Sequence, residues 1–180
     1  SYSGFFPQKK NLNVEKKNIT LVKCKDCHLV QLNQRFNPKK LYNKGYGYRT
    51  GINRTMTDHV SGIVKKAIKI SDLKKNDYVL DIASNDGTLL NFYPKNIVKV
   101  GCDPILKKFN KLYKNIKIKI PDFFSYEKVI NKINSSNKFR IITAIAVFYD
   151  LNNPNKFLID VSKLLKNNGI FILEMADLYK

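Results

Sequence analysis

The stretch 79–90, with the sequence VLDIASNDGTLL, constrains the fold of this chain more than any other. Its apolar start is typical of a buried strand, and Asp81 lies near the carboxyl end of that strand. Residues 83–87 are small or turn-forming, which lets a ligand approach the backbone closely. We expect Thr88 to cap a following helix, whose free N–H groups favour a polar or anionic ligand. The stretch therefore predicts a strand–turn–helix unit with a ligand site at its turn.

A second strand is predicted at 97–104, IVKVGCDP, and it ends in another acid, Asp103. Asp103 follows Asp81 by about twenty residues, as does the acid of a βαβ unit that binds the two hydroxyls of a ribose. The G-x-G-x-x-G spacing of dinucleotide sites is missing. The two strands therefore indicate a nucleoside-cofactor site, and they favour S-adenosylmethionine over a dinucleotide.

Length and composition set the outer bounds. The 180 residues, 43% of them hydrophobic, are enough for one good core with a small appendage. No apolar run approaches the roughly 20 residues that span a membrane, and no signal peptide is visible, so no membrane partner is expected. The net charge of +19 invites a nucleic-acid partner, but the lysines are spread over the whole chain among many Asn and Ile residues. We therefore do not expect nucleic-acid binding; a basic surface would also suit a diphosphate-bearing small substrate.

The three cysteines indicate a reducing compartment, so we expect a cytoplasmic protein rather than a disulfide-stapled secreted domain. Cys24 and Cys27 form a C-x-x-C hairpin, which is half of a tetrahedral zinc site. His28 is poorly placed to complete it, and His59 is expected to be a pocket or surface residue. Zinc-bound and metal-free forms of the hairpin both stay open. Cys102 is expected to be a small buried thiol.

The chain is expected to have three parts. Residues 1–35 form a partial zinc-binding, zinc-ribbon-like hairpin unit, with strands at 19–24 and 28–32. Residues 36–76 form a Tyr-rich linker and a packing helix, which helical spacing of apolar residues predicts at 54–70. Residues 77–180 form a nucleoside-cofactor domain of the Rossmann-like type.

Strands and helices alternate from residue 77 onward, which predicts an α/β fold with a parallel sheet covered on both faces. Right-handed crossovers then put the ligand at the carboxyl ends of the first two strands. The predicted strands are 78–82, 97–102, 116–120, 139–147 and 170–175. The predicted helices are 88–93, 105–114, 125–134 and 155–166, the last one stopped by Asn168–Gly169.

The polar turn is expected to hold the amino-acid end of the cofactor. Asp81 or Asp86 can receive its ammonium, and backbone N–H groups near Gly87 can receive its carboxylate. Further cofactor-binding residues are expected to be Ala83, Ser84, Asn85, Pro104, Asp122, Phe123, Ala146 and Phe148.

Two of these predictions have equally good alternatives. Asp122 and Phe123 can contact an adenine ring, or they can be a helix-terminal charge and a core residue. Ala146 is small where a cofactor must pass, whereas Phe148 can equally be core. The sequence does not identify a catalytic residue.

Nearly the whole chain resembles sugar-nucleotide C-methyltransferases, which are S-adenosylmethionine-dependent enzymes with an N-terminal zinc-binding domain and a class I methyltransferase domain. The matching runs are CKDCHLVQL at 24–32, YGYRTGIN at 46–53, VLDIASNDGTLL at 79–90, VGCDP at 100–104, FF at 123–124, TAIAVFYDLNNP at 143–154 and IFILE at 170–174. Ala83 stands where the family commonly has Gly, a departure that leaves the cofactor assignment in place.

The resemblance implies a function. A base removes a proton next to the keto group of a nucleotide-linked sugar, and the resulting enolate attacks the cofactor methyl group. Tyr46, Tyr48 and Arg49 would cover the cofactor or reach the substrate. In the family a further Cys pair precedes Cys24, and a C-terminal domain binds the sugar and supplies the base. We therefore expect a truncated fragment that binds the cofactor without turnover.

Two other functions stay open. One is methylation of another small molecule on oxygen or nitrogen, which the Cys hairpin and the Tyr-rich linker disfavour. The other is a basic RNA-binding module with a methyltransferase-like sheet. The acids Asp81 and Asp103 disfavour it, because a surface that tracks phosphates has no need of carboxylates there.

Overall fold

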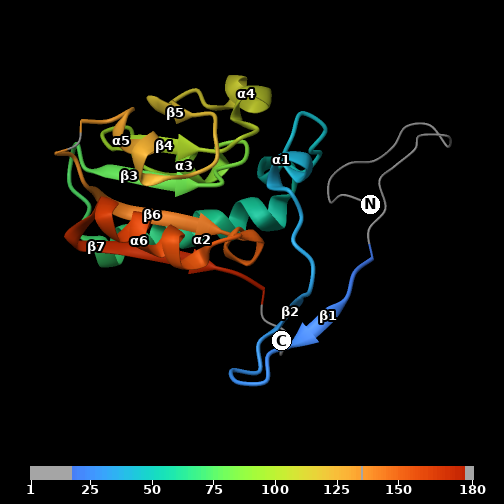
Figure 1. The fold of residues 1–180 in the computed structure, drawn as a ribbon. Coiled ribbons are helices and arrows are strands. Elements are labelled where there is room, and N and C mark those ends of the chain that lie inside the picture. Colours follow the sequence, from blue (N-terminus) through green and yellow to red (C-terminus); the bar gives the residue numbers. More distant parts are fainter. Residues whose placement is uncertain (1–17, 135, 177–180) are drawn as a thin grey trace. The chain divides into compact units, whose positions relative to one another are not determined.

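The computed structural model describes residues 18–134 and 136–176. The first seventeen residues of the predicted 1–35 unit, and the last four of the 77–180 domain, lie outside the described residues. The chain divides into two compact units, residues 1–48 and residues 49–180, which are treated separately below. Figure 1 labels their helices and strands.

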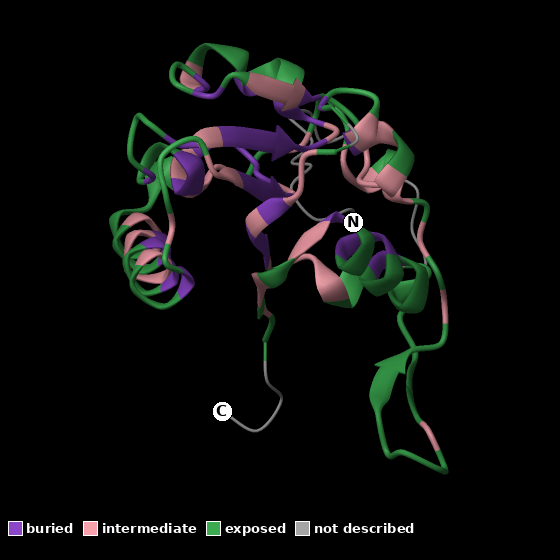
Figure 2. Cartoon of the chain, turned by 90° about the vertical axis from the view of Figure 1, so that its left-hand side faces the viewer, coloured by how far each residue is buried: buried purple, intermediate pink, exposed green. Residues whose placement is uncertain are grey.

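The N-terminal unit contains the predicted hairpin. Strands β1 (Leu21–Lys23) and β2 (Val30–Leu32) pair antiparallel. The turn between them carries Cys24 and Cys27, and both strands are exposed (Figure 2). A short helix, α1 (Pro38–Leu41), follows and is capped by the Asn37 side chain.

The second unit is built on a five-stranded sheet in which every pair is parallel. Its strands are β3 (Tyr78–Ile82), β4 (Val98–Cys102), β5 (Ile118–Ile120), β6 (Phe139–Ile145) and β7 (Leu165–Glu174). The strand order is β5-β4-β3-β6-β7, so the chain reverses its direction of growth beside β3. This confirms the predicted α/β class and puts the switch point at the stretch 79–90.

The helices of this unit are mostly short. They are α2 (Arg54–Ser71), α3 (Thr88–Asn91), α4 (Leu106–Phe109), α5 (Tyr126–Ile130) and α6 (Pro154–Leu164), with 3₁₀ turns η1 (Thr50–Ile52), η2 (Asn110–Leu112) and η3 (Phe148–Asp150). The helix predicted at 105–114 is therefore split into α4 and η2. Within the described part of the chain, no helix has the length and apolar character needed to cross a membrane.

Alternation along the strands divides the core between the two sheet faces. Leu80 and Ile82 pack on one face in a cluster with side chains of α5 and α6. Val79 and Asp81 point to the other face, where α2 contacts β6 and β7. Figure 1 shows α6 and α2 on opposite sides of the sheet. The polar turn after β3 therefore follows a strand that is buried on both faces.

Helix α2 confirms the helix predicted at 54–70. The Asn53 side chain caps it by accepting a hydrogen bond from the Met56 N–H, 3.2 Å away. Val60, Val64 and Ala67, spaced for one helix face, are buried. The helix thus presents its other faces, including the one that carries charged residues, away from the core.

The predicted stop of the last helix at Asn168–Gly169 is wrong. Helix α6 ends at Leu164, and β7 begins at the next residue. The sheet imposes this, because Phe139 pairs with Leu165 while Ile141 already pairs with Ile170. The four intervening residues, 166–169, therefore bulge out of register.

The predicted capping role of Thr88 is also wrong. Gly87, with φ 78°, is the residue before the helix, and Thr88 is the first helical residue. The Thr88 hydroxyl and backbone N–H both donate to Asp86 Oδ1, over 2.6 and 3.3 Å. The acid two residues earlier satisfies the helix start in place of the threonine.

We expect Gly169→Ala to lower the free energy of unfolding by about 1–3 kcal/mol. A Cβ at this position would lie 2.8 Å from the Phe139 carbonyl oxygen, so the bulge would have to move. Urea unfolding of the chain measures the effect. Gly62→Ala is the matched control: it lies in α2 with nothing within 4 Å of an added Cβ. There the same change should stabilise by about 0.5–1 kcal/mol. Equal effects at both positions would contradict the role of the bulge.

We expect Ala83→Gly to raise the free energy of unfolding by about 0.5–1 kcal/mol. Ala83 has φ 59°, a left-handed conformation that costs a residue with a Cβ roughly 1–2 kcal/mol. The greater freedom of glycine in the unfolded chain offsets part of this gain. The opposite sign is expected for Ala67→Gly in helix α2, which should destabilise by at least about 1 kcal/mol. A loss of stability in Ala83→Gly would count against strain in the turn.

Candidate functional site

Asp81 is a buried acid at the carboxyl edge of the sheet, with only 3% of its surface exposed. The Thr143 hydroxyl, on neighbouring β6, donates a hydrogen bond of 2.6 Å to Asp81 Oδ1. Burial raises the pKa of Asp81 to about 7, since the charged form loses its hydration; the charge on Asp103 adds to the rise, and the Thr143 bond opposes it. Asp81 is thus a carboxylate with one strong hydrogen bond and a marked need for a cation.

Asp103, at the end of β4, joins two loops. Its Oδ2 accepts a hydrogen bond of 2.8 Å from the Asn85 N–H, and its Oδ1 accepts one of 2.8 Å from the Ile105 N–H. Burial raises the pKa of Asp103 to about 6, while these two hydrogen bonds act in the opposite direction. Each carboxylate oxygen can accept a second hydrogen bond, so the acid can still bind hydroxyl groups of a ligand.

Asp86 is satisfied by the chain itself. Its Oδ2 accepts from the Gly51 N–H over 3.0 Å and pairs with the Arg49 Nε over 3.3 Å, while its Oδ1 accepts from Thr88. A Cβ on Gly51 would lie 2.6 Å from the Thr88 hydroxyl oxygen, so the 49–51 segment lies directly against the turn. Of the two acids expected to receive a ligand ammonium, Asp81 is therefore the better candidate.

The middle of the turn is held by a tyrosine that the sequence did not indicate. The Tyr113 hydroxyl donates to the Asn85 carbonyl oxygen over 2.7 Å and lies 2.9 Å from the Ser84 Oγ. The Asn85 Oδ1 in turn accepts from the Thr50 N–H over 3.0 Å. A residue following α4 and a residue preceding α2 thus fix the same turn from two sides.

One buried hydroxyl near this edge lacks a partner. Tyr93 is 3% exposed, and its hydroxyl has no hydrogen-bond partner among the described residues. Burial raises the pKa of Tyr93, and the negative charge of Asp81 raises it further. An unpaired buried hydroxyl costs stability, so a ligand or water that bonded to it would be favoured.

The remaining predicted cofactor residues lie at the ends of neighbouring strands. Pro104 and Ala146 directly follow Asp103 and strand β6, and Ala146 is exposed with φ 54°. Asp122 pairs with Lys128 over 2.8 Å, and its Oδ1 accepts from the Phe123 N–H over 2.7 Å. Their contacts with a cofactor stay predictions.

Phe148 has a clear structural role. Its ring lies 6.0 Å from that of Phe157, an edge-on contact at the rim of the core cluster. The alternative assignment of Phe148 to the core is thus supported by a contact, and a cofactor role is a prediction.

The N-terminal unit carries the other predicted site residues, Tyr46, Tyr48, Cys24 and Cys27. The backbone hydrogen bonds of Cys27 and Asp26 to the Cys24 thiolate lower the pKa of Cys24. Within residues 18–134 and 136–176, no three His, Cys, Asp or Glu side chains gather to hold a metal ion. The two cysteines are thus positioned as a pair only, and the roles of the tyrosines stay predictions.

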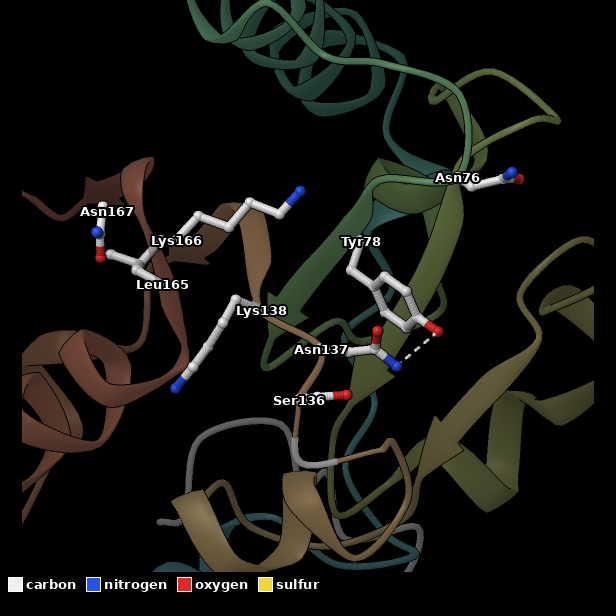
Figure 3. A pocket seen from close by; sticks show the side chains of 8 residues that line it. All are labelled: Asn76, Tyr78, Ser136, Asn137, Lys138, Leu165, Lys166 and Asn167. Carbon is white, nitrogen blue, oxygen red and sulfur yellow. Dashed lines mark hydrogen bonds between the residues drawn. The ribbon is translucent and has the colours of Figure 1, made fainter.

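A second polar region lies at the opposite, amino-terminal edge of the sheet. It is a pocket of about 450 Å³ lined by Asn76, Tyr78, Ser136, Asn137, Lys138, Leu165, Lys166 and Asn167. Figure 3 shows its two lysine amines pointing apart. Each has a protein acceptor: Lys166 donates to Asp77 Oδ1 over 2.6 Å, and Lys138 donates to the Lys163 carbonyl oxygen. With its cations directed elsewhere, this pocket is a poorer ligand site than the acidic edge.

A pair missed by the sequence lies at the carboxyl end of β7. His59 on α2 places its Nε2 2.8 and 2.9 Å from the two carboxylate oxygens of Glu174. The two residues are 115 positions apart, so no local pattern could have indicated the contact.

Comparison with known proteins identifies the fold of this chain. No family model and no curated protein matches the chain. Solved structures do match, among them an S-adenosylmethionine-dependent methyltransferase from Clostridium acetobutylicum ATCC 824, with 22% identity over 69% of this chain and 52% of that one and a TM-score of 0.53. The plantazolicin methyltransferase BpumL, in complex with a pentazolic desmethylPZN analog and SAH, matches with 16% identity over 65% and 46% of the two chains and a TM-score of 0.52.

DesVI from Streptomyces venezuelae matches with 14% identity over 70% of this chain and 53% of that one, at a TM-score of 0.51. This chain thus spans about half the length of the solved structures that it matches. At such low identities the likeness concerns the fold. The unit built on the parallel sheet has the Rossmann-like fold of class I S-adenosylmethionine-dependent methyltransferases.

Proposed function

We propose that this chain binds S-adenosylmethionine and is part of a methyltransferase acting on a carbon of a nucleotide-linked keto sugar. The observation that carries the cofactor assignment is the pair of buried acids, Asp81 and Asp103, at the switch point of a methyltransferase fold. Structural likeness to methyltransferases supports the reaction class. The sugar and the carbon acceptor are supported only by the resemblance of the sequence motifs.

The residues at the acidic edge fit this cofactor. Asp81 has an oxygen left beside its bond to Thr143. Burial raises the pKa of Asp81, and a ligand ammonium beside it would favour its charged form. The two oxygens of Asp103 keep acceptor capacity for ribose hydroxyls. The unpartnered Tyr93 hydroxyl, close enough to sense the Asp81 charge, is a further polar group that a bound molecule can satisfy.

The cofactor, when bound, supplies an activated methyl group. The chain contributes position and charge. Asp81 would hold the ammonium, and Asp103 would fix the ribose. Hydrogen bonds from Tyr113 and Thr50 to Asn85 would hold the turn in the conformation that binds both the amino-acid part and the ribose of the cofactor. Holding the methyl group and the acceptor carbon in line accounts for much of the acceleration in such a reaction.

Two finer parts of the proposal concern the N-terminal unit. Cys24 and Cys27 would bind zinc together with a second pair of ligands, as the resemblance implies. Tyr46 and Tyr48 would cover the cofactor, beside Arg49. The Arg49 guanidinium, which pairs with Asp86 and lies 5.7 Å from the centre of the Phe109 ring, would keep the 49–51 segment on the turn.

We expect calorimetric titration to show saturable binding of S-adenosylhomocysteine that Asp103→Ala weakens at least tenfold, or about 1.4 kcal/mol. Because Asp103 also holds the Asn85 N–H, the variant must be shown to be folded by its circular dichroism. Asp72→Ala changes a solvent-exposed acid at the end of α2, which pairs with Lys74; it serves as the control and should leave the affinity unchanged. A folded wild-type chain that binds no S-adenosylhomocysteine would remove the cofactor from the proposal.

We expect the affinity for S-adenosylhomocysteine to fall about tenfold between pH 8 and pH 6. Asp81, with a pKa of about 7 in the free chain, is mostly charged at pH 8 and mostly protonated at pH 6, where it no longer attracts an ammonium. Asp81→Asn should bind weakly and lose most of this dependence, since its amide does not titrate. If the variant kept the wild-type slope, another group would have to hold the ammonium.

A further inference from the structure

The His59–Glu174 pair lies at the same edge of the sheet as the cofactor acids. Glu174 is the last residue of β7 and pairs with Ile145 of β6. The preceding residue of β6, Ala144, pairs with Ile82, the last residue of β3. Strand β6 separates β7 from β3, and adjacent strands lie about 4.8 Å apart, so the pair is about 10 Å across the sheet from the polar turn. That distance suits a second molecule bound beside the first.

The strand between the two places is followed by a small residue. Strand β6 is followed by Ala146, an exposed residue with φ 54° whose N–H donates to the Glu174 carbonyl oxygen over 2.9 Å. A methyl side chain at this point places no bulk between the turn and the pair. Ligands on either side of Ala146 could therefore approach each other.

The pair presents acceptor groups to a ligand. The His59 Nε2 faces both Glu174 oxygens, so with a charged carboxylate it is the nitrogen that carries the proton and donates. The Nδ1 of a neutral imidazole is then an acceptor, and the Glu174 oxygens retain further acceptor capacity. The side chains are 46% and 38% exposed, so a ligand can reach them. Two adjoining acceptors favour a ligand with several O–H donors.

Helix α2 links this pair to the cofactor turn. The Thr57 hydroxyl donates to the Thr50 carbonyl oxygen over 3.4 Å, and Thr50 donates in turn to Asn85. His59 lies two residues further along the same helix. The helix therefore sets the imidazole relative to the turn.

We propose that His59 and Glu174 form the acceptor subsite, where they bind hydroxyl groups of a sugar whose carbon receives the methyl group. This inference rests on the proposed function and deepens it, because it says which residues of this chain recognise the sugar. Glu174 acts as a positioning residue that fixes the tautomer and direction of the imidazole, and His59 contacts the sugar.

The test measures binding of two nucleotides to the chain saturated with S-adenosylhomocysteine. One probe is a nucleoside diphosphate that carries a keto sugar, and the other is the same nucleoside diphosphate without the sugar. His59→Phe should weaken binding of the keto-sugar nucleotide at least tenfold and leave binding of the nucleoside diphosphate within twofold of wild type. Glu174→Gln should weaken sugar binding less, because its amide oxygen can still accept from the imidazole.

Three controls separate this inference from a structural role and from the proposed function. The affinity for S-adenosylhomocysteine and the midpoint of thermal unfolding should be unchanged in His59→Phe. His28→Phe changes the only other histidine, which lies in the N-terminal unit, and should have no effect on sugar binding.

Wild-type sugar affinity in His59→Phe would overturn the inference, as would an equal loss of affinity for both nucleotides. A wild-type chain that binds S-adenosylhomocysteine but neither nucleotide would overturn the subsite in this chain while leaving the cofactor site intact. A wild-type chain that binds the keto-sugar nucleotide without S-adenosylhomocysteine affinity would overturn the cofactor proposal alone.

Discussion

The structure of the site depends on how three buried carboxylates at one sheet edge are satisfied. Asp86 has donors from Gly51, Arg49 and Thr88, and Asp103 has two backbone N–H groups. Among the described residues, Asp81 has one side-chain donor, the Thr143 hydroxyl. A buried charge needs several hydrogen-bond donors or a counter-ion. The three acids differ in the number of donors that they have, and they therefore differ in function. Two acids build the turn, and the third is left in need of a cation.

The electrostatic cost is visible in the raised pKa values of Asp81 and Asp103. Burial raises both pKa values, and the charge on Asp103 raises that of Asp81 further. The net charge of +19 on the chain does not supply a cation to either acid. Its lysines are exposed for the most part; the two in the amino-edge pocket bind acceptors at the far end of the strands. The net charge of the chain therefore does not predict the ligand of this site, whereas the position of each acid in the sheet does.

Much of the fold could be predicted from the sequence. Strand β3, its polar turn and the alternation that follows have strong local patterns, and the parallel sheet follows from them. The helix stop predicted at Asn168–Gly169 is wrong. The composition of these residues is typical of a helix end, but the pairing register of β6 with β7 determines their structure. Register depends on how two strands pair, so the composition of one turn does not determine it.

The site was predictable only in part, for the same reason. Asp81 is the last but one residue of β3 and Asp103 directly follows β4, so the pairing of these neighbouring parallel strands brings the two acids to one edge. Tyr113 and Thr143 reach the turn from positions 28 and 62 residues away from the residues that they contact, and their sequence surroundings are ordinary. Partners of this kind depend on which side chain happens to face the turn after the sheet has formed.

The contact between η1 and the turn has a consequence for amide hydrogen exchange. The N–H groups of Thr50 and Gly51 donate to side chains of Asn85 and Asp86, not to carbonyl groups of their own segment. Both amides belong to a surface segment and would exchange quickly if the turn opened. Their exchange rates therefore measure the order of the cofactor turn from outside it, 35 residues away in the chain.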